Sequence, residues 1–211
     1  MVSRVSSRTA VSAVPVLLVL LSIVPVAAGV VRLVELSGHP VVTAANARFV
    51  ARSLPVVLHI VSVVPYSLLG AFQFSSSYRR RWPRWHRIAG ATLAPLGLLA
   101  AVTGVWMAHT YPWPAGDGQA LYVIRILAGT AMALSIVVGV EAIRRRDFAA
   151  HGRWMTRAYA IGMGAGTQVL THVPWFLFVG TPGELSRTLL MAAGWAINIA
   201  VAERSFYRRT S

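Results

Sequence analysis

Six stretches of about 20 mostly apolar residues dominate this sequence of 211 residues. A helix of about that length crosses the roughly 30 Å of hydrocarbon in a membrane. Hydrophobic residues make up 56% of the chain and charged residues only 12%, which is not the composition of a soluble domain. We therefore predict an all-α, polytopic membrane bundle that forms one domain over residues 1–211. Its predicted spans are 11–33, 50–74, 88–108, 119–143, 154–179 and 188–203.

The distribution of positive charge indicates the orientation. All 20 basic residues are arginines, and 15 of them, including Arg4 and Arg8, lie on the side of the predicted bundle that holds both termini. Because arginine-rich segments stay on the cytoplasmic side, we expect both termini in the cytoplasm. The net charge of +14 then reflects topology and attraction to anionic lipids. It does not predict nucleic-acid binding, because the connecting loops are too short to form a basic domain.

Two absent residue types restrict the chemistry. Without cysteine the chain has no disulfide, iron–sulfur cluster or thiolate nucleophile. Without lysine it cannot form a Schiff base with a cofactor such as retinal. The six acidic residues form no paired-carboxylate or metal-binding motif, so nothing points to a soluble hydrolase.

A weak internal repeat predicts which spans form the core. Residues 86–113 and 151–175 each contain a helix with a histidine at both ends. The repeat suggests two related hairpins, made of the second and third spans and of the fourth and fifth. These would form a central four-helix core, with the first and sixth spans at the periphery. On the fifth span, His151 and His172 fall on nearly one face, since they are separated by three heptads.

Ionisable residues inside the apolar spans are candidates for function, because a charge in hydrocarbon is costly unless it is paired, coordinated or hydrated. His59 and His172 should both lie about 12 Å below the outer surface, and Arg125 about 9 Å below it. His109 should be nearer that surface and Gln168 one turn below His172. We predict that these five residues meet in an outer layer.

Two histidines that face each other in a dry four-helix core can ligate the iron of a b-type haem, and an arginine can neutralise a propionate. We therefore predict haem b with His59 and His172 as its iron ligands and with Arg125, His109 and Gln168 around it.

A second, inner layer is predicted at the cytoplasmic boundary. It consists of His86, Arg87, His151, Arg153 and Arg157. Two interpretations remain open: arginines that reach lipid phosphates, or a site for an anion or a quinone headgroup.

Three sequence strings resemble a known family. They are Gly70-Ala-Phe-Gln73, His86-Arg87 followed by Gly90, and His151-Gly-Arg-Trp-Met-Thr-Arg157-Ala-Tyr159. Over residues 54–165 the chain resembles bacterial predicted membrane proteins catalogued as domain of unknown function 2306. This resemblance implies a multi-helix protein of the bacterial plasma membrane and supplies no reaction. The placement of the histidines is also similar, more loosely, to that of cytochrome b561-type four-helix haem proteins.

Three functions follow as expectations. The first is a haem redox protein that exchanges electrons with a quinone or a similar partner. The second is a small proton-coupled transporter that uses His59, His172 and Arg125 as its relay and substrate clamp. The third is a non-catalytic assembly or lipid-interaction protein, suggested by small residues at heptad spacing between Gly90 and Ala108.

Overall fold

The computed structural model describes residues 13–210, with side chains up to residue 206. Within these residues all regular secondary structure is helical, and there is no strand. The helices are α1 (Val14–Ser37), α2 (Ala47–Ala51), α3 (Ser53–Gly70), the 3-10 helix η1 (Ala71–Phe74), α4 (Ser76–Arg81), α5 (Pro83–Thr110), α6 (Gln119–Arg144), α7 (Phe148–Gly162), α8 (Gly164–Phe178) and α9 (Glu184–Thr210). The predicted all-α fold is confirmed. Val11, where the first predicted span begins, lies outside the described residues, as do Arg4 and Arg8.

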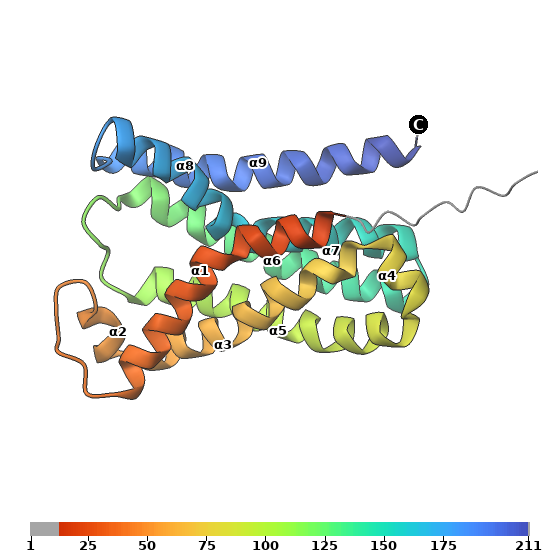
Figure 1. Cartoon of the computed structure of the whole chain (residues 1–211), viewed down its shortest axis with the longest axis horizontal. Helices are drawn as coiled ribbons and strands as arrows, with labels where there is room; N and C mark the ends of the chain where they lie inside the picture. The colour runs from red at the N-terminus through yellow and green to blue at the C-terminus, as the bar shows by residue number, and fades with distance from the viewer. Residues whose placement is uncertain (1–12, 211) are drawn as a thin grey trace, which may run out of the picture.

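The long helices run back and forth along the long axis of the molecule (Figure 1). We call the end with α2, the α5–α6 connection and the α8–α9 turn the outer end. The opposite end, with α4 and the α6–α7 turn, is the inner end. The first turn of α1 and the last turn of α9 both point toward the inner end (Figure 1). The chain thus begins and ends its described course on the arginine-rich side.

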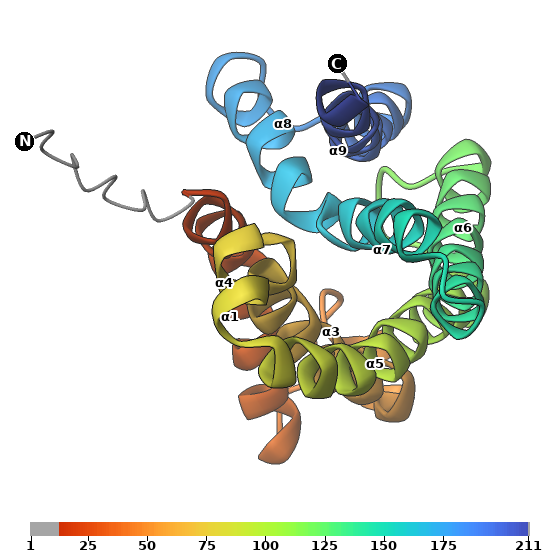
Figure 2. The same cartoon turned by 90° about the vertical axis from the view of Figure 1, so that its right-hand side faces the viewer.

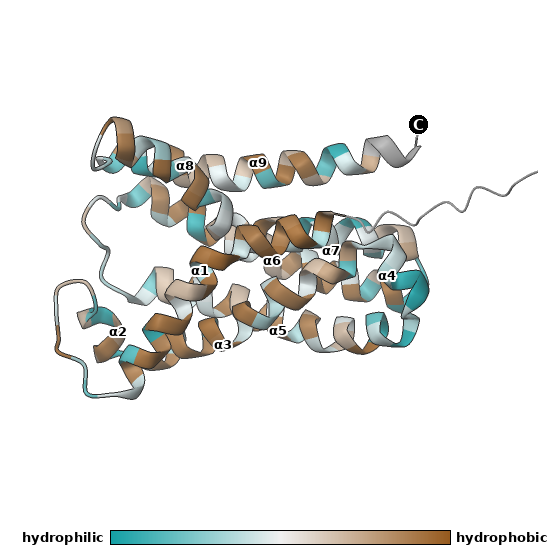
Figure 3. Cartoon of the chain, in the orientation of Figure 1, coloured by the Kyte–Doolittle hydropathy of each residue, from teal (hydrophilic) through white to brown (hydrophobic). Residues whose placement is uncertain are grey.

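Among the described residues, five helices are long and apolar enough to cross a membrane: α1, α3 continued through η1, α5, α6 and α9 up to Phe206. They match five of the six predicted spans. Many of their apolar side chains are exposed, for example Leu17, Val31 and Val34 of α1. Figure 3 shows these apolar segments along the helices and polar residues around α4 at the inner end. Such a surface is suited to lipid contact.

The fifth predicted span, 154–179, is wrong as a single helix. The helix is interrupted at Met163, so that this segment forms two helices, α7 and α8. Figures 1 and 2 show that α8 runs in a different direction from α7. Two glycines permit close helix contacts beyond the break: an added Cβ at Gly164 would lie 2.2 Å from Trp195 Nε1, and one at Gly166 would lie 2.3 Å from the Leu21 carbonyl oxygen. His151 and His172 therefore do not share one continuous helix face.

The four-helix core is present in the inner half, where α3, α5, α6 and α7 pack together. Its buried side chains are Tyr66, Leu93, Ala101, Met132, Ile136, Ala158, Tyr159 and Met163, with Ala71 of η1. In the outer half, α8 packs instead on α9 and α1, and α1 also contacts α3. The fifth crossing is thus central on the inner side and peripheral on the outer side.

Candidate functional site

A cavity of about 460 Å³ lies in the middle and outer half of the bundle. Every α-helix except α4 contributes to its lining, and most of the lining side chains are apolar, among them Val63, Val64, Met107 and Met132. The cavity begins where α8 diverges from the core, since Gly162 and Ala165 on either side of the break line it. A mostly apolar cavity with a few polar groups is typical of a small-molecule site.

His59 is the histidine of the cavity wall. Its Nδ1 lies 2.9 Å from the Ala100 carbonyl oxygen and 3.2 Å from Thr103 Oγ1. A carbonyl oxygen only accepts, so Nδ1 carries the proton and donates it to Ala100. The other ring nitrogen, Nε2, then keeps its lone pair. Anchoring one nitrogen in this way orients the ring and leaves the other for a ligand or a metal.

Arg125 also lines the cavity, and it forms an ion pair with Asp117. The other carboxylate oxygen of Asp117 accepts from Arg187 Nε at 2.6 Å. The Asp117 side chain is 1% exposed, so this carboxylate is held between two arginines from α6 and α9. Asp117 and Arg187 were not predicted as site residues, because charged residues are common in loops and at helix ends, and hydropathy does not show which of them face a cavity.

Arg48, on the short helix α2, is the third arginine of the lining. Its guanidinium lies 4.6 Å from the Phe49 ring centre, and its Nε is buried without a hydrogen-bond partner among the described residues. Burial lowers the pKa of Arg48, and the positive charges of Arg125 and Arg187 lower it further, while Asp117 raises it. The charge of Arg48 is therefore under-compensated by the protein.

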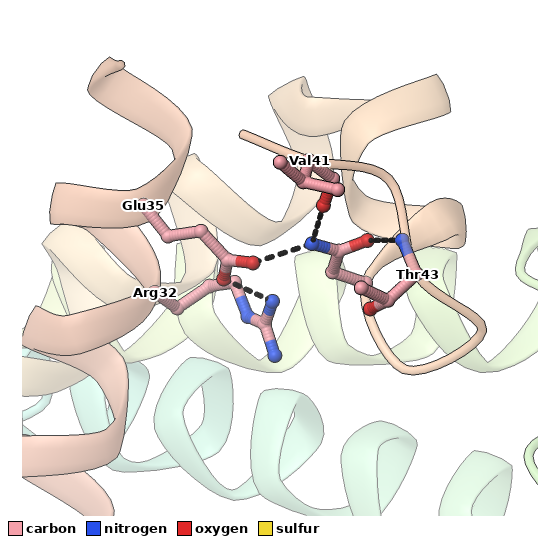
Figure 4. Close-up of polar contacts among 5 residues, drawn as sticks. Arg32, Glu35, Val41 and Thr43 are labelled. Carbon is pink, nitrogen blue, oxygen red and sulfur yellow. Dashed lines mark hydrogen bonds and ion pairs between the residues drawn. The ribbon is translucent and has the colours of Figure 1, made fainter. Parts of the chain in front are cut away.

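A polar cluster between α1 and α2 fixes the position of this helix (Figure 4). Asn46 Nδ2 donates to Glu35 Oε1 at 2.5 Å and to the Val41 carbonyl oxygen at 2.9 Å, and the Thr43 amide donates to Asn46 Oδ1 at 2.7 Å. Glu35 is also paired with Arg32. The loop before α2 is thereby tied to the end of α1, which holds Arg48 beside the cavity.

The five predicted outer residues do not all meet. Gln168 lines the cavity with His59 and Arg125, and its Nε2 donates to the Met191 carbonyl oxygen at 3.1 Å. His109 is exposed and lies outside the lining, with Nδ1 3.0 Å from Tyr122 Oη. His172 also lies outside the lining; its Nδ1 donates to the Gln168 carbonyl oxygen at 2.7 Å, and its Nε2 is buried without a partner. Haem ligation by His59 and His172 stays a prediction.

The inner layer is divided as well. His151 Nδ1 donates to the Gly139 carbonyl oxygen at 2.8 Å, and His86, whose Nδ1 is buried without a partner, lies within electrostatic range of His151. Arg157 instead pairs with Glu203 of α9 at 2.6 and 3.0 Å. Arg87 and Arg153 are exposed. The two histidines thus lie near each other, while the arginines face α9 or the surroundings.

A tyrosine pair separates the cavity from the inner layer. The rings of Tyr66 and Tyr159 lie 5.6 Å apart, and Tyr159 Oη donates to the Ser67 carbonyl oxygen at 2.6 Å. An added Cβ at Gly70 would lie 2.6 Å from the Tyr159 ring. Gly70 and Tyr159, from two of the strings that suggested a family, therefore form one packing contact.

Comparison with known proteins identifies the family. Residues 56–205 match the model of a family described as "Predicted membrane protein (DUF2306)". This confirms the resemblance seen in the sequence and extends it into α9, up to residue 205. No curated protein and no solved structure matches the chain. In the part of the chain that the structure describes, no group of three or more histidine, aspartate or glutamate residues could hold a metal ion.

Proposed function

We propose that this chain, which belongs to the DUF2306 family of predicted membrane proteins, binds an apolar small molecule or cofactor in its outer cavity, with His59 as the key contact. The observation that carries the proposal is the orientation of His59. Its ring lines a mostly apolar cavity, and its Nδ1 proton is committed to Ala100, so that Nε2 is the free nitrogen.

Haem b is the occupant that would use all of these features. His59 Nε2 would ligate the iron, and Arg48, Arg125 or Arg187 would neutralise the propionates. His172 is the proposed second ligand, because its buried Nε2 has no hydrogen-bond partner in the described part of the chain. It lies outside the lining, so bis-histidine ligation requires a shift of α8. Bound haem would supply one-electron transfer, with a quinone or a similar molecule as the proposed partner.

The test is a visible spectrum. The protein is expressed with haem supplied, purified in a mild detergent, and measured as a reduced-minus-oxidised difference spectrum with a pyridine haemochrome assay. We expect a sharp α-band and near-stoichiometric haem, both lost in His59→Ala. His39→Ala, which removes an exposed histidine from the α1–α2 loop, serves as the control and retains them. A colourless, well-folded wild-type protein rules out haem. Retention of the full spectrum in His172→Ala rules out His172 as an iron ligand and leaves the assignment of His59 intact.

A proton-coupled transporter is the second candidate, and the helix break favours it. Secondary transporters place substrate sites beside interrupted helices, and here Ile161, Gly162, Ala165 and Gly166 around the break all line the cavity. In proteoliposomes that contain a pH-sensitive dye, we expect proton flux above that of empty vesicles and a lower flux for Arg125→Ala. Flux equal to that of empty vesicles would exclude this candidate.

The proposed setting is a bacterial plasma membrane with the inner end toward the cytoplasm, as the arginine distribution favours. The absence of cysteine makes a direct test simple. Thr181→Cys places a thiol in the exposed α8–α9 turn, and Ala149→Cys places one at the exposed inner end. In intact cells an impermeant maleimide should label only the first. Labelling of only the second would reverse the orientation.

A further inference from the structure

The outer end of the cavity holds more positive charge than nearby acidic groups neutralise. Arg48, Arg125 and Arg187 all line it, and Asp117 is the carboxylate that pairs with two of them. Two other acidic residues are close by but outside the lining. Glu35 pairs with Arg32 and Asn46, and Glu184 lies against Gly118, outside the lining. At the end of an apolar cavity, three guanidinium groups thus lie near one buried carboxylate, which pairs with Arg125 and Arg187 and leaves Arg48 without an ion pair among the described residues.

Such an excess is unfavourable in a partly desolvated site, because each charge removed from water needs a partner. Arg48 shows the deficit most directly, since its Nε is buried and no acceptor of the described residues reaches it. Arg125 and Arg187 are oriented by Asp117, with side chains that are 26% exposed. An anionic group placed among the three would accept from Arg48 and share the charge of the other two.

The remainder of the cavity has the opposite character. Val63 and Val64 of α3, Met107 of α5 and Ala128 of α6 form its walls, and they offer a ligand only apolar contact. A fully polar anion would satisfy the arginines and leave this volume without a complement. A neutral apolar molecule would fill the volume and leave the arginines without one.

We infer that the outer cavity is a site for an amphipathic acid, a molecule whose carboxylate or phosphate head lies among Arg48, Arg125 and Arg187 and whose apolar body lies along α3, α5 and α6. This inference rests on the proposed function in that it concerns the same cavity, and it names the chemical class of the ligand. It does not require that the ligand be haem. Asp117 partly neutralises two of the arginines and therefore competes with the head for them.

The test compares an acid with its ester. Purified, haem-free protein in a non-ionic detergent is titrated with a fluorescent probe, 11-(dansylamino)undecanoic acid, and with its methyl ester. We expect the acid to bind at least about tenfold more tightly than the ester, because one charge-assisted hydrogen bond contributes about that factor in affinity. Arg48→Gln should remove this preference. Arg52→Gln removes the same charge from an exposed residue outside the cavity lining and should retain it. Competition by dodecanoate or by dodecyl phosphate then shows which head the site prefers.

A second variant, expected to raise the affinity for the acid, tests whether the weaker binding of Arg48→Gln is caused by misfolding. Asp117→Asn frees Arg125 and Arg187, so the acid should bind more tightly even though the unliganded protein melts at a lower temperature. Equal affinities for acid and ester, or an Arg48→Gln variant that binds like the wild type, would overturn the inference. A colourless protein that prefers the acid excludes haem and supports the inference. If the protein carries haem, apoprotein is reconstituted with haem and with its dimethyl ester, and equal retention of the two overturns the inference.

Discussion

The outer and inner halves of the molecule are built from the same helices but differ in how the fifth crossing is placed. In the inner half, α7 packs into the core against α6 and α3, and Tyr66 and Tyr159 fill the centre. In the outer half, α8 turns away to α9 and α1 (Figure 2). The cavity there is lined by residues of these helices and of α3, α5 and α6. The break at Met163 thus separates a closed half from an open one.

The two halves also differ in how deeply their paired charged side chains are buried. At the outer end Asp117 is almost fully buried and serves two arginines beside a cavity. At the inner end the Arg157–Glu203 pair joins α7 to α9 with both side chains about one-third exposed, and neither residue lines the outer cavity. In the outer half a buried charge lies beside space for a ligand, which makes that half the place where a substitution should affect both stability and binding.

The largest expected effect compares these two carboxylates. Asp117→Asn leaves two arginines without their shared partner, so we expect a loss of about 3 kcal/mol in the free energy of unfolding. Glu203→Gln breaks a more exposed pair and should lose about 1 kcal/mol, because solvent screens it. Reversible unfolding in mixed detergent micelles measures both losses. Equal losses would show that the outer pair is no more desolvated than the inner one.

The same comparison explains what the sequence could predict. The length and apolar character of the spans led to five of the membrane helices, and the internal repeat led to the four-helix core. The break could not be predicted, because residues 162–166 are apolar or small on both sides of it. Gly162, Gly164 and Gly166 weaken the helix there, but the close approach of Trp195 and Leu21 to Gly164 and Gly166 exists only in the folded chain.

The candidate site was predictable to the extent that its residues lie inside apolar spans. His59, Arg125 and Gln168 stood out for that reason, and the structure brings all three to the cavity. Arg48 and Asp117 lie in a short helix and a loop, where charged residues are ordinary, so hydropathy gave no signal for them. His172 was placed by its depth alone, and the altered direction of α8 moves it outside the lining.

A second prediction tests whether the break depends on close packing. An added Cβ at Gly166 meets the Leu21 backbone at 2.3 Å, so Gly166→Ala must separate α8 from α1 and should lose about 2 kcal/mol. Gly152 of α7 has nothing within 4 Å of an added Cβ, so Gly152→Ala should gain about 0.5 to 1 kcal/mol from helix propensity. Unfolding curves provide the comparison. A stabilising Gly166→Ala would mean that α8 does not cross α1 so closely.

The smallest expected effect concerns the tyrosine pair that closes the inner half. Tyr66 is fully enclosed and its hydroxyl has no partner, whereas the hydroxyl of Tyr159 donates to the Ser67 carbonyl oxygen. Removing an unpaired buried hydroxyl relieves a desolvation penalty, so Tyr66→Phe should gain about 1 kcal/mol, and Tyr159→Phe should lose about 1 kcal/mol. Because the two rings are in contact, the double variant tests whether the effects add. If Tyr66→Phe instead destabilises the protein, its hydroxyl is bonded to a ligand or water below the cavity, and the boundary between the two halves is less closed than the packing of the side chains indicates.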